Sequence, residues 1–284
     1  MSSVGFPVGV PPLDKVLSEH GRIGGPTPHG WHTFEPMFSC WRMYHLGNTQ
    51  PRQEARTDKA LAVGILLHEL LAIYYKAAKT GGTYNDTQPA VDTLLALVSS
   101  TGYQEEAAET KRLYDGYRKR YEGNDGYISP SVRIVAVEDP IRRDFPWGDP
   151  YTIRLDLVLQ LPDGYWIADH KTTWGRSTEF IEGWQIDPSV LGMLWAAQEK
   201  YSPLRGASIN GVIKTKEPDY DRFTFAYDTR IVADWLRMME YKSAERRIAA
   251  LAGWPPNFKA CFGKYRKCGY FEQCVYGVEA SGRG

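Results

Sequence analysis

The sequence predicts an α/β protein in which helices flank a mixed central sheet. Apolar residues recur with helical spacing over residues 57–79, strict alternation replaces that pattern between residues 132 and 171, and helical spacing returns after residue 188. Side chains on one helix face repeat every 3.6 residues, whereas those on one strand face repeat every second residue. Because no internal repeat or linker separates these segments, we expect the helices and the sheet to share one core.

The first part of the chain predicts an irregular arm followed by helices. Residues 1–30 are rich in Pro and Gly, which is typical of irregular structure. Aromatic and apolar residues then follow at helical spacing over residues 34–46. The clearest helix is predicted over residues 57–79, where a Thr-Asp pair can cap the start and two glycines end the pattern. A further helix is predicted over residues 103–121, which carries a stripe of tyrosines.

Period-two alternation predicts five strands in the middle of the chain. They cover residues 132–138, 151–160, 165–171, 207–214 and 222–227. A Pro-Asp-Gly turn joins the second and third strands into a hairpin. The remaining helices are predicted over residues 188–200 and 230–251.

Composition is that of a soluble globular protein and does not choose a ligand. Lys plus Arg equals Asp plus Glu at 34 each, so the formal net charge is zero. That balance neither supports nor excludes nucleic acid, because basic residues can gather in one groove. No uninterrupted apolar run reaches the ~20 residues of a membrane span, and no signal peptide precedes the domain. We therefore expect a cytoplasmic protein without a membrane partner, in which thiols stay reduced.

The hairpin carries the first candidate site. Alternation places Asp169 and Lys171 on one face of their strand, and Asp156 lies in the partner strand among apolar residues. Converging carboxylates repel one another unless a cation compensates them, and Mg²⁺ or Mn²⁺ prefers oxygen ligands. A nearby ammonium can stabilise charge that develops on a phosphate. The alternatives are a solvated strand face for the D-x-K pair and, for Asp156, a salt bridge to Arg154 or Arg133.

His68 is a second candidate ligand. It lies in the longest apolar helix, one turn after Gly64, where a missing side chain would let a ligand or another backbone approach. A lone helical histidine is more often a core residue with satisfied hydrogen bonds than a metal ligand. The adjacent Glu69 is either a further ligand or an exposed neighbour.

Taken together, these motifs resemble the RecB-type nuclease branch of the PD-(D/E)xK superfamily. The matching segments are Gly64-x-x-x-His68-Glu69-Leu70, the strand 153–158 around Asp156, and residues 167–173 around Asp169-His170-Lys171. The resemblance extends from about residue 34 to residue 274. It implies a restriction-endonuclease-like mixed sheet in a single domain over residues 31–284, with a helical insert at about residues 80–130.

The resemblance also implies the roles of the site residues. In such relatives, the equivalents of His68, Asp156 and Asp169 hold Mg²⁺ or Mn²⁺, and the equivalent of Lys171 serves catalysis. Many relatives carry an acid where this chain has Glu138. Relatives also use a helical Gln-Tyr pair to hold the substrate strand, but here Ser189 and Met193 stand at those positions. Gln185 lies close by and is a candidate substitute.

The four cysteines form a second pattern. Three of them follow one another in an aromatic, basic C-terminal segment at residues 255–277, and one lies near the start. Four thiolates can hold a [4Fe–4S] cluster or a structural zinc ion, whereas scattered buried thiols are the simpler alternative. Segments around the first and last cysteines resemble those of AddB-type nucleases and CRISPR adaptation exonucleases. That resemblance implies an iron–sulfur cluster that joins the two ends of the chain, with zinc less favoured. The cysteines are Cys40, Cys261, Cys268 and Cys274.

The expected activity is therefore that of a metal-dependent DNA exonuclease. The resemblance implies hydrolysis of phosphodiester bonds in single-stranded DNA or at duplex ends, in recombination, repair or phage DNA processing. No G-x-x-x-x-G-K-[ST] loop is present, so unwinding would need a helicase or recombination protein as partner. The alternative is a non-catalytic nucleic-acid-binding or scaffold protein that retains the nuclease fold and the cluster.

Overall fold

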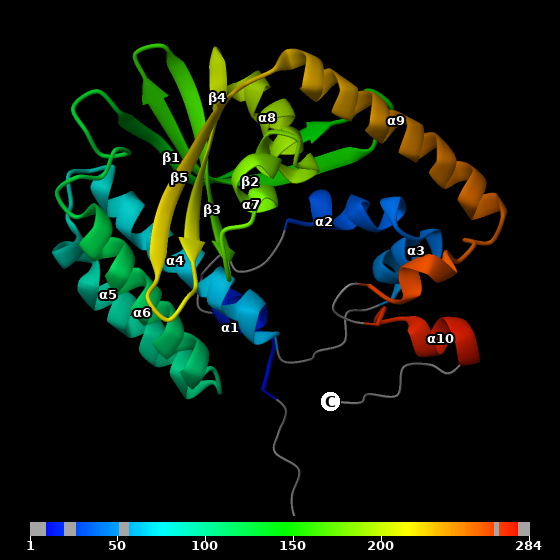
Figure 1. Ribbon diagram of the computed structural model, residues 1–284, viewed down its shortest axis with the longest axis horizontal. Helices are drawn as coiled ribbons and strands as arrows, with labels where there is room; N and C mark the ends of the chain where they lie inside the picture. Colours follow the sequence, from blue (N-terminus) through cyan, green and yellow to red (C-terminus); the bar gives the residue numbers. More distant parts are fainter. Residues whose placement is uncertain (1–9, 20–26, 51–56, 264–266, 278–284) are drawn as a thin grey trace, which may run out of the picture. The chain divides into compact units, whose positions relative to one another are not determined.

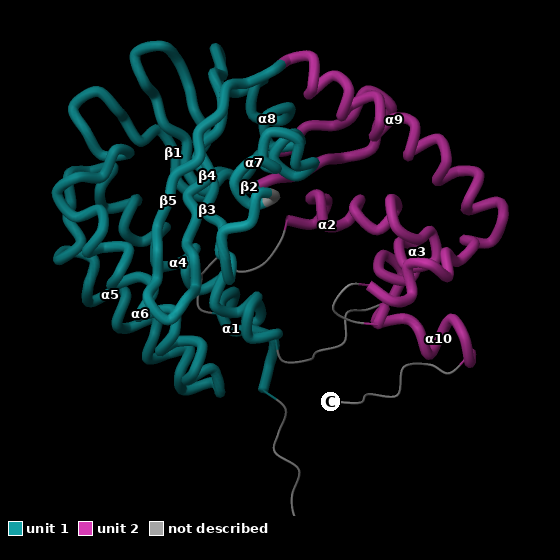
Figure 2. The backbone as a smooth tube through the Cα atoms, in the orientation of Figure 1, with its two compact units in different colours: residues 1–25, 54–141, 154–228 teal, residues 26–53, 142–153, 229–284 magenta. Residues whose placement is uncertain are grey.

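The chain folds into two compact units, and two strands contribute residues to both of them. The computed structural model describes residues 10–19, 27–50, 57–263 and 267–277. Strands β1 (Arg133–Asp144) and β2 (Pro150–Leu161) pass from one unit into the other (Figure 2). Unit 1 comprises Met1–Gly25, Glu54–Ile141 and Arg154–Asp228, and unit 2 comprises Pro26–Gln53, Arg142–Ile153 and Thr229–Gly284.

A five-stranded mixed sheet, with strand order β1-β2-β3-β4-β5, organises unit 1 (Figure 1). The strands are β1 (Arg133–Asp144), β2 (Pro150–Leu161), β3 (Gly164–Thr173), β4 (Leu204–Ile213) and β5 (Asp219–Ala226). The pairs β2–β3 and β4–β5 are antiparallel, whereas β3 and β4 are parallel. A parallel pair needs a crossover, and the chain between β3 and β4 supplies it as helices. The predicted mixed α/β architecture is confirmed.

Helices cover both faces of this sheet. Helices α4, α5 and α6 lie on one side in Figure 1, and α7 and α8 lie on the other. The core of unit 1 forms where α4 and α6 meet the apolar residues of β2 and β3. The ranges are α1 (Leu13–Glu19), α4 (Lys59–Ala78), α5 (Tyr84–Ser100), α6 (Gln104–Tyr121), α7 (Thr178–Glu182), η2 (Gly183–Gln185) and α8 (Pro188–Lys200).

Helix starts follow the predicted caps. The Asp58 carboxylate accepts the Ala60 N–H at 3.0 Å where α4 begins, and Asp187 accepts the Ser189 N–H at 2.9 Å where α8 begins. Each bond satisfies a donor that the helix itself leaves unpaired.

The helices that were not anticipated from the sequence include α1 and α5. Residues Leu13–Glu19, expected to be irregular, form α1, because three apolar residues at i, i+3 and i+4 give the segment a buried face. Helix α5 lies within the region expected to be a helical insert, although its own pattern was not recognised. Thr83 and Asp86 form a capping box at its start, and Pro89 lies inside it.

Helix α4 is the central helix of unit 1. Among the described residues it is the one helix long and apolar enough to cross a membrane by length and composition. Its most apolar stretch is 50% buried inside the protein, which is typical of a core helix.

Unit 2 is built mainly from helices around an aromatic core. The rings of Phe34, Phe145, Tyr151 and Trp235 lie within 6 Å of their neighbours in this group. Asp149 accepts hydrogen bonds from Arg246 and Ser243 beside them. The ranges are α2 (Trp31–Phe34), η1 (Glu35–Phe38), α3 (Trp41–Thr49), α9 (Thr229–Leu251), η3 (Phe258–Cys261) and α10 (Phe271–Tyr276).

Candidate metal centre

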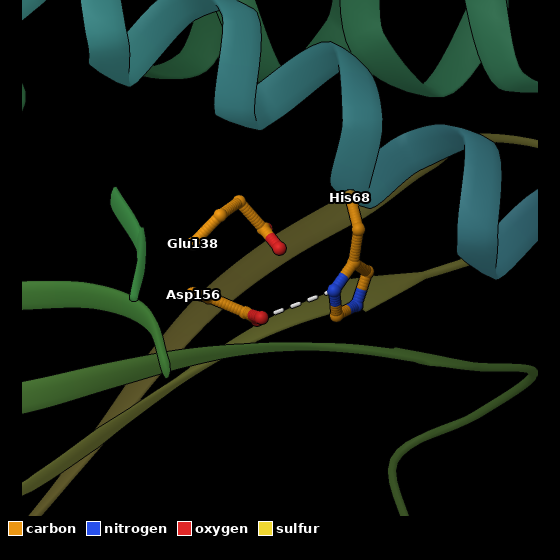
Figure 3. A group of neighbouring side chains, drawn as sticks. All are labelled: His68, Glu138 and Asp156. Carbon is orange, nitrogen blue, oxygen red and sulfur yellow. Dashed lines mark ion pairs between the residues drawn. The ribbon is translucent and has the colours of Figure 1, made fainter. Parts of the chain in front are cut away.

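Four elements of unit 1 bring the predicted site residues together. His68 comes from α4, Glu138 from β1, Asp156 from β2, and both Asp169 and Lys171 from β3. One potential ligand atom from each of His68, Glu138 and Asp156 lies within 4.8 Å of the others. Figure 3 shows these three side chains pointing toward a common space.

Asp156 lies at the point where the β2–β3 ladder ends. The antiparallel residue pairs of β2 and β3 run from Leu161↔Gly164 to Leu157↔Ala168. Continued by one residue, this register would place Asp156 opposite Asp169. Instead of a main-chain partner, the His170 N–H donates to Asp156 Oδ2 at 2.7 Å. The same oxygen lies 3.3 Å from His68 Nδ1. The side chain of Asp156 is therefore held by the backbone of β3 and by His68 on α4.

Lys171 faces Asp169 on one side of β3, as alternation predicts. Lys171 Nζ lies 2.6 Å from Asp169 Oδ2, and the Asp169 side chain is 7% exposed. The Lys171 ammonium is therefore the partner of this oxygen, through its charge and a side-chain hydrogen bond. A buried carboxylate oxygen normally requires such a partner.

Glu138 reaches the site through an unusual backbone conformation. Its φ of 55° lies in the left-handed region, which costs a non-glycine residue of order 1–3 kcal/mol. The side chain is 7% exposed, and Arg154 Nε lies 2.5 Å from Oε2. Arg154 therefore pairs with Glu138. Strain and a buried charge at one position are typical of functional sites.

The pKa values of His68 and Asp156 are shifted in opposite directions. Burial lowers the pKa of His68, but the charge and hydrogen bond of Asp156 outweigh burial and raise it to about 9. Burial also raises the pKa of Asp156, but His68 and then the neighbouring cations hold it below its usual value. In the metal-free protein these two groups therefore form a charged pair.

The other two acids resist ionisation. Burial and then the charge of Asp156 raise the pKa of Glu138 to about 7, although Arg154 opposes them. Burial also raises the pKa of Asp169, against the attraction of Lys171. Carboxylates kept from ionising by burial and by one another gain most from a bound cation.

Two weaker candidates lie at the edges of this cluster. Glu69 is buried beside His68 on α4, and its charge contributes to the raised pKa of Glu138. Gln185 is exposed at the end of η2. Sequence reasoning overlooked its neighbour Trp184, whose ring centroid is 6.0 Å from Lys171 Nζ. Only the packing of η2 on the sheet reveals that contact.

A buried polar network contacts β3 on the face opposite Asp169 and Lys171. His170 Nδ1 lies 2.6 Å from Asn210 Nδ2, and Asn210 also donates to the Tyr117 hydroxyl at 2.9 Å. Arg222 donates to the same hydroxyl at 2.9 Å and pairs with Asp125 at 2.7 Å. Burial lowers the pKa of His170 to about 3, so the ring is neutral near pH 7. No local sequence pattern connects these residues, which come from different elements.

The four cysteines all belong to unit 2. Cys40 precedes α3 and its sulfur accepts the Asn257 N–H at 3.3 Å, while the Cys268 N–H donates to the Cys261 carbonyl at 2.8 Å. Burial raises the pKa of the Cys274 thiol, and the other three thiols raise it further although Arg42 opposes them. The two ends of the cysteine pattern are therefore near one another within this unit. The cysteines are Cys40, Cys261, Cys268 and Cys274.

The donor set fits a hard divalent cation. Carboxylate oxygens with one imidazole suit Mg²⁺ or Mn²⁺, which leave coordination places for water and phosphate oxygens. The raised pKa values of the buried carboxyl groups of Glu138 and Asp169 are the sign that a positive ligand is expected here. His68, Glu138 and Asp156 form the group that could hold such an ion, with one nitrogen and two oxygen donors. Asp169, the other predicted ligand, is paired with Lys171 beside them.

The family follows from comparison with known proteins. The sequence model of the PD-(D/E)XK nuclease superfamily matches residues 37–274, so the chain belongs to this superfamily. Its members are nucleases that use divalent metal ions.

Similar solved structures share little sequence with the chain. A crystal structure of a “Putative exonuclease” from Eubacterium rectale has 12% identity and a TM-score of 0.49, and the match covers 88% of this chain and 93% of that one. The structure of the protein SSO0001 has 10% identity and a TM-score of 0.31, with 76% and 86% covered. No curated protein matches the sequence.

Proposed function

We propose that the protein is a metal-dependent DNA exonuclease of the RecB type, acting in the cytoplasm on single-stranded DNA or duplex ends. The observation that carries this proposal is the convergence of His68, Glu138 and Asp156 beside the Asp169–Lys171 pair. Recombination, repair or phage DNA processing is the proposed setting, with a helicase or recombination protein as partner.

Each side chain has a distinct role in this proposal. A bound Mg²⁺ or Mn²⁺ would polarise a phosphoryl oxygen and lower the pKa of its water ligand. His68, Asp156 and Asp169 would hold the ion, with Glu138 as an additional donor, and the His170 N–H keeps Asp156 in position. Burial lowers the pKa of Lys171, but Asp169 and Asp156 outweigh burial and raise it, so Lys171 stays charged. Its ammonium can orient the attacking water and stabilise charge on the phosphate.

The experiment is digestion of DNA labelled at one end, with Mn²⁺, by wild-type protein and by Asp169→Asn and Lys171→Ala variants. We expect each variant to lose at least about a hundredfold in rate, as when a group that stabilises the transition state is removed. Lys200→Ala is the matched control, because this lysine pairs with Asp139 on the same unit and is 49% exposed. Digestion at the wild-type rate by both site variants would contradict the proposal.

A circular single strand tests the exonuclease mode separately. Resistance of the circle, with digestion of the same sequence when linear, is expected if the enzyme needs a free end. The position of the label released first then gives the direction of digestion. Rapid cutting of the circle would instead establish an endonuclease of the same family.

For the cysteines we propose a structural [4Fe–4S] cluster, with zinc as the less favoured occupant. The mutual influence of four thiols in unit 2 supports a common ligand set. Protein purified without oxygen is expected to carry about four iron atoms per chain. One zinc ion per chain, without iron, would contradict the iron–sulfur assignment.

A non-catalytic role is the second candidate. The pair expected to handle substrate is occupied here by Ser189, which bonds to the capping Asp187, and by the buried Met193. Neither side chain is free to serve a substrate strand. Binding of DNA in the absence of any nucleotide release with Mg²⁺ or Mn²⁺ would favour this scaffold role.

A further inference from the structure

Trp174 is a large exposed side chain directly after strand β3. It follows Lys171 by three residues, a distance of roughly 10 Å along an extended chain. The residue is 66% exposed. Tryptophan is enriched at binding surfaces, where its large ring contributes much of the buried area.

The turn that carries Trp174 is fixed at three points. The Lys214 N–H donates to the Thr173 carbonyl at 2.6 Å, and Thr173 Oγ1 donates to the Gly175 carbonyl at 3.1 Å. Arg176 then pairs with Asp221 on β5 at 2.7 Å. The backbone on both sides of the tryptophan is thus held to the sheet. An aromatic ring presented in this way loses little conformational entropy on binding.

A lysine supports the ring from the protein side. Lys214 Nζ lies 4.9 Å from the centroid of the Trp174 ring, a distance typical of a cation–π contact. The residue Lys214 is 4% exposed, and the charges of Glu109 and Asp58 act on its ammonium. The contact holds the ring over a positive charge and leaves the other parts of the ring accessible.

We propose that Trp174 is a stacking platform for an unpaired nucleobase of the substrate strand, with Lys214 supporting its ring. The inference rests on the proposed nuclease function and specifies its substrate class as strands with unpaired bases near the site. Every nucleobase offers a flat face to an aromatic ring, but the faces of paired bases are covered by stacking within the duplex. A platform of this kind therefore selects single strands or frayed ends, without regard to sequence.

The test is binding of a fluorescein-labelled 20-nucleotide single strand and of the matching blunt duplex, measured by anisotropy in EDTA and in Ca²⁺. We expect Trp174→Leu to weaken single-strand binding about tenfold, within the range of five- to 150-fold for loss of one stacked base. Duplex binding should change less than about twofold. Trp174→Phe is the matched control, because it keeps a ring and should retain most of the affinity.

Three results would overturn the inference. They are equal weakening on both substrates, retention of single-strand affinity by Trp174→Leu, and no single-strand binding by the wild-type protein in either buffer. Thermal unfolding of the variants separates a binding effect from a loss of structure. Because binding is measured without hydrolysis, a chain that stacks single strands but releases no nucleotide would refute the nuclease function and leave this inference standing.

Discussion

Replacing Arg222 by methionine tests the buried polar network that contacts β3 through His170. Arg222 NH1 lies 2.7 Å from Asp125 Oδ1, and their side chains are only 15% and 3% exposed. The guanidinium carbon also lies 3.6 Å from the centroid of the Tyr127 ring and 4.0 Å from that of Tyr121. Methionine preserves most of the length of the side chain but none of its charge or hydrogen bonds.

The expected loss is large because it leaves Asp125 charged and buried. Removing one partner of a buried ion pair costs about 3–5 kcal/mol, and the lost cation–π contacts place Arg222→Met toward the upper end. A domain of ordinary stability has only about 5–15 kcal/mol in total. With a urea slope of about 3 kcal/mol/M, the unfolding midpoint should fall by about 1 M or more.

Urea unfolding followed by far-UV circular dichroism measures this loss, and a double mutant identifies its cause. Combining Arg222→Met with Asp125→Leu removes both charges, so the double variant should be more stable than the sum of the single losses predicts, by more than about 1 kcal/mol. A loss below about 1 kcal/mol for Arg222→Met, or strict additivity, would refute the reasoning.

Two further stability predictions follow from contacts elsewhere in the molecule. Burial raises the pKa of Asp149, but Arg246 and Ser243 outweigh it and lower the pKa below its usual value. Its contribution is present above about pH 4 and lost as pH falls through the lowered pKa, so the melting temperature of wild-type protein should fall more steeply below pH 4 than that of Asp149→Asn. Gly116→Ala should cost about 1–3 kcal/mol, because a Cβ there would overlap Tyr220, and this outweighs the helix propensity that alanine gains. Gly175→Ala, where a Cβ meets open space, should be neutral in the same urea unfolding experiment.

The placement of the acidic pair was predictable from periodicity. Alternation fixed Asp169 and Lys171 on one face of β3, and the Pro-Asp-Gly turn paired that strand with the strand of Asp156. The turn and the alternation together set the register, because a shift of one residue would have moved every apolar side chain to the wrong face. Helix α4 was equally predictable from its cap and its apolar face.

Other parts of the site depend on contacts between distant segments. The left-handed backbone at Glu138 has no local signal, because glutamate rarely adopts that conformation and surrounding contacts must impose it. The Arg154–Glu138 pair was missed for a related reason. Arg154 is close to Asp156 in sequence, but the strands place its guanidinium against the neighbouring β1. Helix α1 was hidden because Pro and Gly dominate the composition around its short apolar stripe.

The sequence by itself determined which residues can bind a cation and which strand and helix carry them, because those choices follow from side-chain chemistry and from short-range periodicity. Only the tertiary structure decided how they meet. It turned Glu138 toward His68 and Asp156, and it set Trp174 over Lys214 at the end of β3. These are consequences of packing between elements that lie far apart in the chain, where the free energy of burial overrides local preference.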